Sequence, residues 1–106
     1  MAKNLEVSLL LDYYGSLLTE RQRATAEYYF NDDLSLAEIA ELEGVTRQAV
    51  RDLVRRTESQ LEGFEQKLHF ARRISEACSM IRRMQASLDG AQAEKCDEVV
   101  KFLMKE

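Results

Sequence analysis

The residues best suited to chemistry lie in one short stretch, 46–57. Four arginines and one aspartate give it a net charge of +3: Arg47, Arg51, Arg55 and Arg56 against Asp52. Gln48 stands among them. A guanidinium group can donate two hydrogen bonds to a guanine edge, and a glutamine amide can pair with adenine in a similar way. The stretch therefore predicts a surface that binds nucleic acid.

In a helix that begins at Thr46, five side chains would share the binding of nucleic acid. We expect Arg47, Gln48 and Arg51 to reach base edges from the first turns of the helix. Thr46 and the free amides of the helix start would hold a phosphate group, and Arg55 would contact the DNA backbone farther along. The alternative is a helix that serves only for packing, with its arginines in contact with water.

The sequence has no comparable cluster of catalytic or metal-ligating residues. His69 is the only histidine, and the spacing of Cys78 and Cys96 matches no zinc or redox motif. We see no nucleophile with a neighbouring base, no phosphate-binding loop and no metal-ligand group. The sequence therefore predicts a protein that is not an enzyme, with no catalytic residue, no cofactor and no metal.

The composition indicates which elements must position the arginines. The chain has 106 residues, of which 45% are hydrophobic and 32% charged, with no proline and four glycines. This composition favours a small folded, all-α protein, because short strands need more turn residues. We also expect a cytoplasmic protein without membrane insertion, since no apolar run approaches ~18 residues and no signal pattern begins the chain.

The overall charge argues against DNA binding. Residues 1–60 carry seven basic and eleven acidic residues, and residues 61–106 carry eight of each, so the chain has a net charge of −4. An acidic protein is a poor candidate for phosphate contacts. Glu38, Glu41 and Glu43 would lie on the helix that precedes the arginines. Any nucleic-acid surface must therefore be local.

A helix-turn-helix pattern occupies residues 36–55. Ser35 and Glu38 form a capping box, and Leu34 with Ile39 can form a hydrophobic staple at the same helix start. Gly44 can supply the positive φ of a tight turn. Small and apolar residues at the other key positions would pack the second helix against the first: Ala40, Ile39, Val45, Val50 and Leu53.

The remaining helices follow from apolar spacing and turn residues. We predict helices over 4–17, 20–31, 36–43, from Thr46 onward, and over 91–105, with a break at 87–90. The first would use a face with steps of four: Leu5, Leu9, Tyr13 and Leu17. The tyrosines and Phe30 are expected in the core rather than as base-stacking platforms.

Two domains are predicted, a helix-turn-helix domain over 1–60 and a C-terminal helical extension over 61–106. An apolar stripe crosses the boundary at heptad-like spacing: Leu61, Phe64, Leu68, Ala71, Ile74, Cys78 and Ile81. It either folds back over the N-terminal helices or pairs with another chain. We favour a homodimer that presents two recognition helices.

Two resemblances rest on sequence motifs. Residues 17–62 resemble the C-terminal domain of bacterial sigma factors, which reads the −35 promoter element. The whole chain resembles the YlxM family, best over its first 70 residues, through the segments LDYYGSLLT (11–19), YYFNDDLSLAEIA (28–40) and TRQAV (46–50) with RTE (56–58). The resemblance implies an all-helical fold and genes that neighbour those of the signal recognition particle GTPases.

Two functions follow as hypotheses. The first is a helix-turn-helix protein that binds DNA and acts as a regulator, in connection with the signal recognition particle pathway. The second is a protein- or RNA-interaction module of that system, with the GTPase or its RNA as partner and no specific DNA site. The acidic balance of the chain favours the second, and the arginines of 46–57 favour the first.

Overall fold

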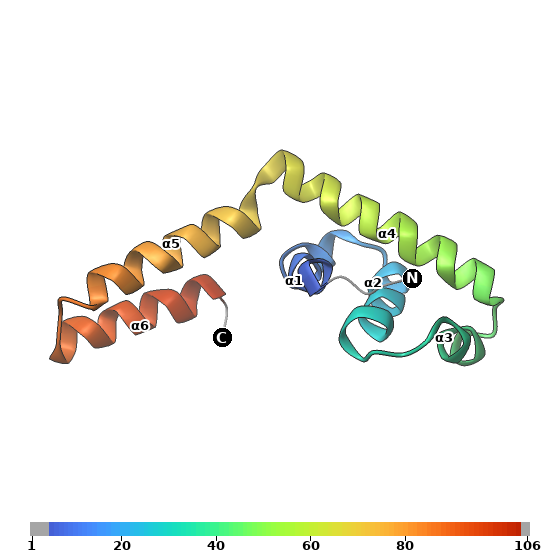
Figure 1. Ribbon diagram of the computed structural model, residues 1–106, viewed down its shortest axis with the longest axis horizontal. Coiled ribbons are helices and arrows are strands. Elements are labelled where there is room, and N and C mark those ends of the chain that lie inside the picture. The colour runs from blue at the N-terminus through green and yellow to red at the C-terminus, as the bar shows by residue number, and fades with distance from the viewer. Residues whose placement is uncertain (1–4, 105–106) are drawn as a thin grey trace. The chain divides into compact units, whose positions relative to one another are not determined.

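The computed structural model describes residues 5–104 and confirms an all-helical protein, with no strand in this range. It forms two compact units, Met1–Leu68 and His69–Glu106 (Figure 1). The α-helices are α1 (Leu5–Tyr14), α2 (Glu20–Ala26), α3 (Leu36–Glu43), α4 (Arg47–Leu68), α5 (Phe70–Gln85) and α6 (Gly90–Met104). None of these helices is long and apolar enough to cross a membrane. Asn4 and Lys105, the outer ends of two predicted helices, lie outside the described residues.

The first helix buries a different face from the predicted one. A 3-10 turn, Gly15–Leu17, follows α1, and both Leu9 and Leu17 are exposed. The buried residues are Val7, Leu10, Leu11 and Tyr14. Steps of three and four stay on one side of a helix with 3.6 residues per turn, whereas repeated steps of four drift around it. The predicted face was wrong for this reason.

The second predicted helix is present over its whole length but changes geometry midway. Its capping box is formed, because the Gln22 amide donates to Thr19 Oγ1 over 3.1 Å and the Gln22 side chain accepts from the Thr19 amide. After α2 the chain widens into a π-helical turn, Glu27–Asn31. This turn contacts both α1 and α3, and it buries the ring of Tyr29. The expectation that this aromatic belongs to the core is confirmed.

Helix α4 is the long element that α1, α2 and α3 contact. It runs through Gly63 without a break and ends only at Leu68, because His69 has a φ of +53°. The structural division therefore falls at 68/69 and not at the expected 60/61. The apolar stripe is divided at the same point. Its first part packs on α1, where the rings of Tyr14 and Phe64 are 5.8 Å apart.

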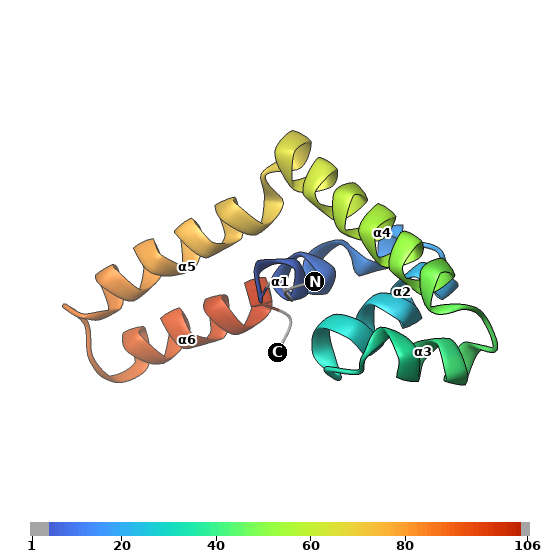
Figure 2. The ribbon, with the colours of Figure 1, turned by 45° about the vertical axis from the view of Figure 1, so that its right-hand side comes forward.

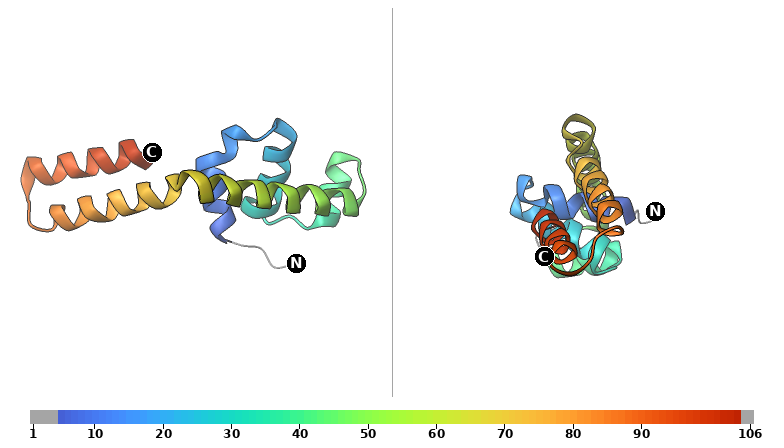
Figure 3. Two further views of the ribbon diagram at one scale, coloured as in Figure 1. Left: turned by 90° about the horizontal axis from the view of Figure 1, so that it is seen from above. Right: turned by 90° about the vertical axis from the view of Figure 1, so that its left-hand side faces the viewer.

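The second unit is an antiparallel hairpin of α5 and α6 (Figure 3). The expected break at 87–90 is confirmed as the turn between these helices. Gln85 Nε2 donates to the Ala93 carbonyl over 2.8 Å and to Asp97 Oδ1 over 2.9 Å, and Arg82 pairs with the same Asp97 carboxylate. A polar network thus sets the register of the hairpin.

Candidate nucleic-acid interface

The helix-turn-helix predicted at 36–55 is present as α3, a short turn and the start of α4 (Figure 2). The Glu38 amide donates to Ser35 Oγ and the Glu38 carboxylate accepts from the Ser35 amide, both over 3.0 Å. Gly44 has a φ of +68°, and the Val45 amide donates to the Ala40 carbonyl. These contacts fix where α3 begins and where it ends.

The start of α4 is held by Thr46. Its Oγ1 accepts a hydrogen bond from the Ala49 amide over 3.0 Å. Thr46 therefore acts as the cap of α4, and its hydroxyl is already engaged with the helix it begins. The remaining free amides of the first turn still face outward at the positive end of the helix dipole.

An apolar cluster holds α4 in place from behind. It consists of Tyr29, Ile39, Ala40, Val50 and Val54, of which Ile39 and Val54 are completely buried. The expected packing roles of Ile39, Ala40 and Val50 are confirmed, while Val45 and Leu53 are only half-buried. Because this cluster occupies one side of α4, the opposite side is left to polar residues.

The predicted site residues all lie at the start of α4, Thr46 as its cap and the others in its first three turns. Thr46, Arg47, Gln48 and Arg55 are exposed, and Arg51 is half-buried. Arg47, Arg51 and Arg55 follow one another at steps of four, and because two such steps turn only about 80° around the helix they form a stripe along one flank. We call these three residues the arginine stripe. Farther along the same flank the charge changes sign at Glu58 and Glu62.

The arginine stripe carries no salt bridge within the described residues. Asp52, the one acidic residue among the arginines, accepts a hydrogen bond from Gln48 Nε2 over 2.9 Å and pairs with neither Arg55 nor Arg56. This contact uses one N–H of the Gln48 amide and holds the side chain in place, while the second N–H and Oε1 stay available.

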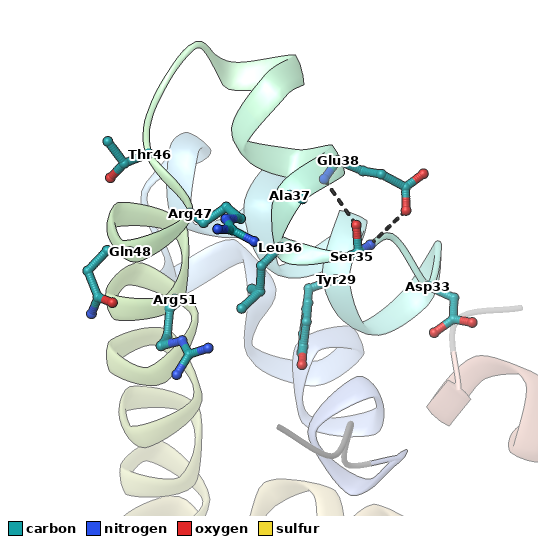
Figure 4. A pocket seen from close by; sticks show the side chains of 10 residues that line it. All are labelled: Tyr29, Asp33, Ser35, Leu36, Ala37, Glu38, Thr46, Arg47, Gln48 and Arg51. Atoms are coloured by element: carbon teal, nitrogen blue, oxygen red, sulfur yellow. Dashed lines mark hydrogen bonds between the residues drawn. The ribbon is translucent and has the colours of Figure 1, made fainter.

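A hollow of about 860 Å³ lies beside the stripe (Figure 4). Arg47 and Arg51 extend toward it from α4, opposite the ring of Tyr29. The side away from α4 includes Asp33, Ser35 and Glu38. The hollow is therefore cationic on one side and acidic on the other. Guanidinium groups attract anionic groups and carboxylates repel them, so the two sides of the hollow differ in the ligands that suit them.

Sequence reasoning did not assign Tyr29, Asp33 or Leu36 to the site. Tyr29 was expected only in the core, and its ring is indeed buried, yet the residue also lines the hollow. The π-helical turn accounts for this placement, since it shifts the residues that follow α2 relative to a regular helix. Sequence spacing gave no signal for that extra residue per turn.

Burial raises the pKa of the Glu58 carboxyl, and repulsion from Glu62 adds to the rise. Neither Glu58 nor Glu62 forms a salt bridge with the arginine stripe in the described part of the chain. No group of three or more metal-ligating side chains occurs in the described residues, and Cys78 and Cys96 are half-buried free thiols.

Comparisons with known proteins agree with the helix-turn-helix geometry. A family model, UPF0122, described as "Putative helix-turn-helix protein, YlxM / p13 like", matches residues 1–100. A UPF0122 protein of Shouchella clausii is 42% identical over 104 residues, which is 97% of this chain and 95% of that protein. One from Clostridium perfringens is 38% identical over 106 residues, 100% of this chain and 93% of that protein. The similarity therefore extends through both units.

Proposed function

The chain belongs to the UPF0122 family of YlxM/p13-like helix-turn-helix proteins, and we propose that it is a regulatory protein that binds double-stranded DNA through α4. The resemblance to YlxM proteins inferred from the motifs is confirmed by the family match. The observation that carries the proposal is the arginine stripe, three guanidinium groups on one flank of α4 without a salt bridge in the described part of the chain.

Each site residue has a role that its position supports. Arg47 and Arg51 lie in the first two turns of α4, where a recognition helix meets base edges, and each can donate two hydrogen bonds to guanine. Gln48 reads adenine with Oε1 and the amide N–H that does not bind Asp52. Arg55 lies one turn farther on and contacts a phosphate group. Thr46 supports phosphate binding by holding the first turn of α4 in place.

The acidic wall of the hollow orients the complex. Asp33 and Glu38 line the hollow opposite the stripe, so a DNA backbone on that side would be repelled. The duplex is therefore expected to approach along α4 with its major groove over Arg47 and Arg51. The same charges lower the affinity for unrelated DNA, because fewer phosphates can be neutralised at once.

The experiment uses the full chain and a 30-base-pair duplex selected by it from a random-sequence pool. Arg47→Ala with Arg51→Ala should weaken binding at least tenfold, since a specific base contact is worth about 1–3 kcal/mol. Arg55→Ala should weaken all duplexes alike and lower the salt slope by about one. Fluorescence anisotropy over a series of salt concentrations measures both effects.

The control removes the same amount of charge elsewhere. Arg21→Ala with Arg83→Ala takes away two exposed arginines of α2 and α5 that lie outside the site. This variant should keep the affinity within about twofold of the original chain. If both double variants weaken binding equally, the attraction is only general charge and the assignment of α4 fails.

The link to the signal recognition particle pathway is part of the proposal and has a competitor. In the competing function the protein binds the particle's GTPase or its RNA and has no DNA site. Crosslinking in cells, followed by identification of the attached molecules, separates the two. Recovery of defined DNA segments supports the regulator, whereas recovery of the RNA or the GTPase without DNA contradicts it.

A further inference from the structure

The outer side of α3 carries an exposed leucine beside a second hollow. Leu42 is 65% exposed, more than any other leucine of the described range. A hollow of about 320 Å³ lies next to it, and its lining consists of two leucines and two glutamates: Leu34, Leu42, Glu38 and Glu41. A single exposed leucine is common on protein surfaces, whereas a leucine beside a hollow can help to enclose an apolar side chain of another molecule. We call these four residues the α3 groove.

The α3 groove has the length and spacing to receive a helix. Leu34 lies just before the Ser35 cap, and Leu42 lies near the other end of α3, so the groove follows the eight residues of this helix. At 1.5 Å per residue they span about 12 Å. Apolar side chains at positions i and i+7 of an α-helix are about 10 Å apart, and such positions are the usual anchors of helices bound in grooves. A helix laid along the groove therefore brings one anchor close to each leucine.

Contacts on the other sides of α3 hold the groove in a fixed shape. Ile39 is completely buried in the core. The two hydrogen bonds of the capping box between Ser35 and Glu38 fix the start of the helix (Figure 4), and the Glu43 carboxylate accepts from the Thr25 hydroxyl near its end. Because the surface is preformed, a partner does not have to order it on binding.

The charge around the α3 groove indicates the chemistry of its partner. Residues 24–46 contain no lysine or arginine and six acidic residues: Glu27, Asp32, Asp33, Glu38, Glu41 and Glu43. This segment therefore has a net charge of −6, larger in magnitude than the −4 of the whole chain. The two glutamates that line the groove are exposed. Such a surface repels nucleic acid, anionic lipid and the same face of a second copy, whereas it attracts a cationic partner.

We propose that the α3 groove binds a basic amphipathic α-helix of another protein. A leucine-sized side chain of that helix enters the hollow between Leu34 and Leu42, and a lysine or arginine beside it pairs with Glu41. Glu38, whose carboxylate accepts from the Ser35 amide, adds negative charge to the groove. No residue of the arginine stripe lines the groove, so this partner does not use the proposed DNA site. The interface is small, and the complex is therefore expected to be transient.

Peptide selection tests the proposal, with the full chain as the target, a random peptide library displayed on yeast, and no DNA present. Peptides of about 16 residues are long enough for a helix of about 24 Å. The selected peptides should carry a net positive charge and apolar residues at helical spacing, and they should bind as synthetic peptides in fluorescence anisotropy. A library that yields no binder at chain concentrations up to about 100 µM, or only acidic or uncharged binders, overturns the proposal.

Two variants of exposed residues locate the bound peptide. Leu42→Ser should raise the dissociation constant of the peptide about tenfold, because it removes an apolar contact. Glu41→Lys should raise it severalfold and weaken its dependence on salt, since an attraction between charges is replaced by a repulsion. Peptide binding that both variants leave unchanged takes place elsewhere on the chain and contradicts the proposal.

The matched controls are Leu17→Ser and Glu94→Lys, which make the same changes at an exposed leucine after α1 and at an exposed glutamate of α6. Each should leave the dissociation constant within about twofold. Equal weakening by the controls would show that the attraction is not specific to the α3 groove and would overturn the proposal. Far-UV circular dichroism checks that helicity is kept, and Glu41→Gln serves if Glu41→Lys loses it. Leu42→Ser should keep its affinity for DNA, so this proposal and the proposed function can fail separately.

Discussion

The two units use arginine and apolar residues in opposite ways. In the first unit an extensive apolar core is buried, although Leu17 and Leu42 remain exposed, and the arginines of α4 carry no salt bridge among the described residues. In the second, Arg72 and Arg82 pair with Glu76 and Asp97 while large apolar side chains remain exposed. The comparison shows that charged or apolar side chains are available for binding where their own unit leaves them without a salt bridge or exposed to water.

The physical basis is that the two units differ in how much buried interior they have. Helices α1, α2 and α3 all contact α4, so that Val50, Val54 and Leu61 are buried. Each helix of the hairpin has only one partner within its unit. The first unit is therefore expected to be the more stable one.

The largest expected effect is on the free energy of unfolding, and it tests the difference in burial between the two units. Ile39→Ala should lower the free energy of unfolding of the first unit by about 2–5 kcal/mol, because it opens a cavity in a completely buried site. Val100→Ala in the hairpin removes less buried surface and should cost only about 1–2 kcal/mol. Urea titrations separate the units, since all four tyrosines lie in the first and both cysteines in the second.

Tyrosine fluorescence therefore follows the first unit, and the rate of thiol modification follows the second. Ile39→Ala should shift the fluorescence midpoint and leave thiol reactivity at low urea nearly unchanged. If instead both probes shift together by the same amount, the units unfold as one and the comparison fails.

A smaller effect concerns the turn of the helix-turn-helix. Gly44→Ala should cost about 1–2 kcal/mol, because alanine is strained at a φ of +68° although nothing lies within 4 Å of the added carbon. Gly63→Ala is the matched change within α4, where the added carbon also meets nothing, and it should stabilise by up to about 1 kcal/mol. Thermal unfolding followed by tyrosine fluorescence measures both. Equal effects of the two variants would contradict the assigned strain.

The next prediction concerns two buried threonines, whose substitution should change the free energy of unfolding by about 1 kcal/mol. The Thr57 hydroxyl is buried without a hydrogen-bond partner, so Thr57→Val should raise the free energy of unfolding. The Thr25 hydroxyl donates to both oxygens of Glu43, at 2.9 and 2.7 Å, so Thr25→Val should lower it. Opposite signs in urea titrations are the expected result. A loss of stability in both would show that Thr57 has a role that the contacts do not explain.

The smallest expected effect is a pH dependence of opposite sign in the two units. Burial raises the pKa of Glu58 above 4.5, so its ionised form opposes folding at neutral pH, and this cost disappears as the pH falls through the raised pKa. Hydrogen bonds from Gln85 and Arg82 lower the pKa of Asp97 below 3.8. Its contribution is present above that pH and is lost as the pH falls through the lowered pKa.

Glu58→Gln should therefore raise the midpoint of the tyrosine transition at pH 7 more than at pH 4. Asp97→Asn should lower the stability of the hairpin at pH 7, with a loss that shrinks below about pH 3.8, because the original chain loses the same contact there. Thermal scans at several pH values check both trends. A pH-independent difference in either case would rule out the assigned titration.

The helix-turn-helix was predictable because its signals are local. The capping box at Ser35, the glycine at the turn and the hydroxyl at Thr46 each act within four residues, and all three are formed. The five predicted contact residues likewise lie in the cap and the first three turns of α4, since they are neighbours in sequence. Whether they contact DNA stays a prediction.

Other features depended on contacts between distant residues. The predicted face of α1 was wrong because the helix offers a second apolar face, with Val7, Leu10, Leu11 and Tyr14, and this second face is the buried one. The pairing of Asp52 with Gln48 was not foreseen, nor was the acidic wall that Asp33 and Glu38 place opposite the stripe. The sequence has no glycine or other turn residue where α4 ends, at Leu68, and the positive φ of His69 was not predicted.

The amino-acid order alone determined the helices, their caps, and the local concentration of positive charge, because these depend on neighbours within one or two turns. Only the tertiary structure decided which apolar residues are enclosed, which arginines are paired and which side of the hairpin remains uncovered. Those outcomes depend on how many partners each helix has, and that number is a property of the packed chain.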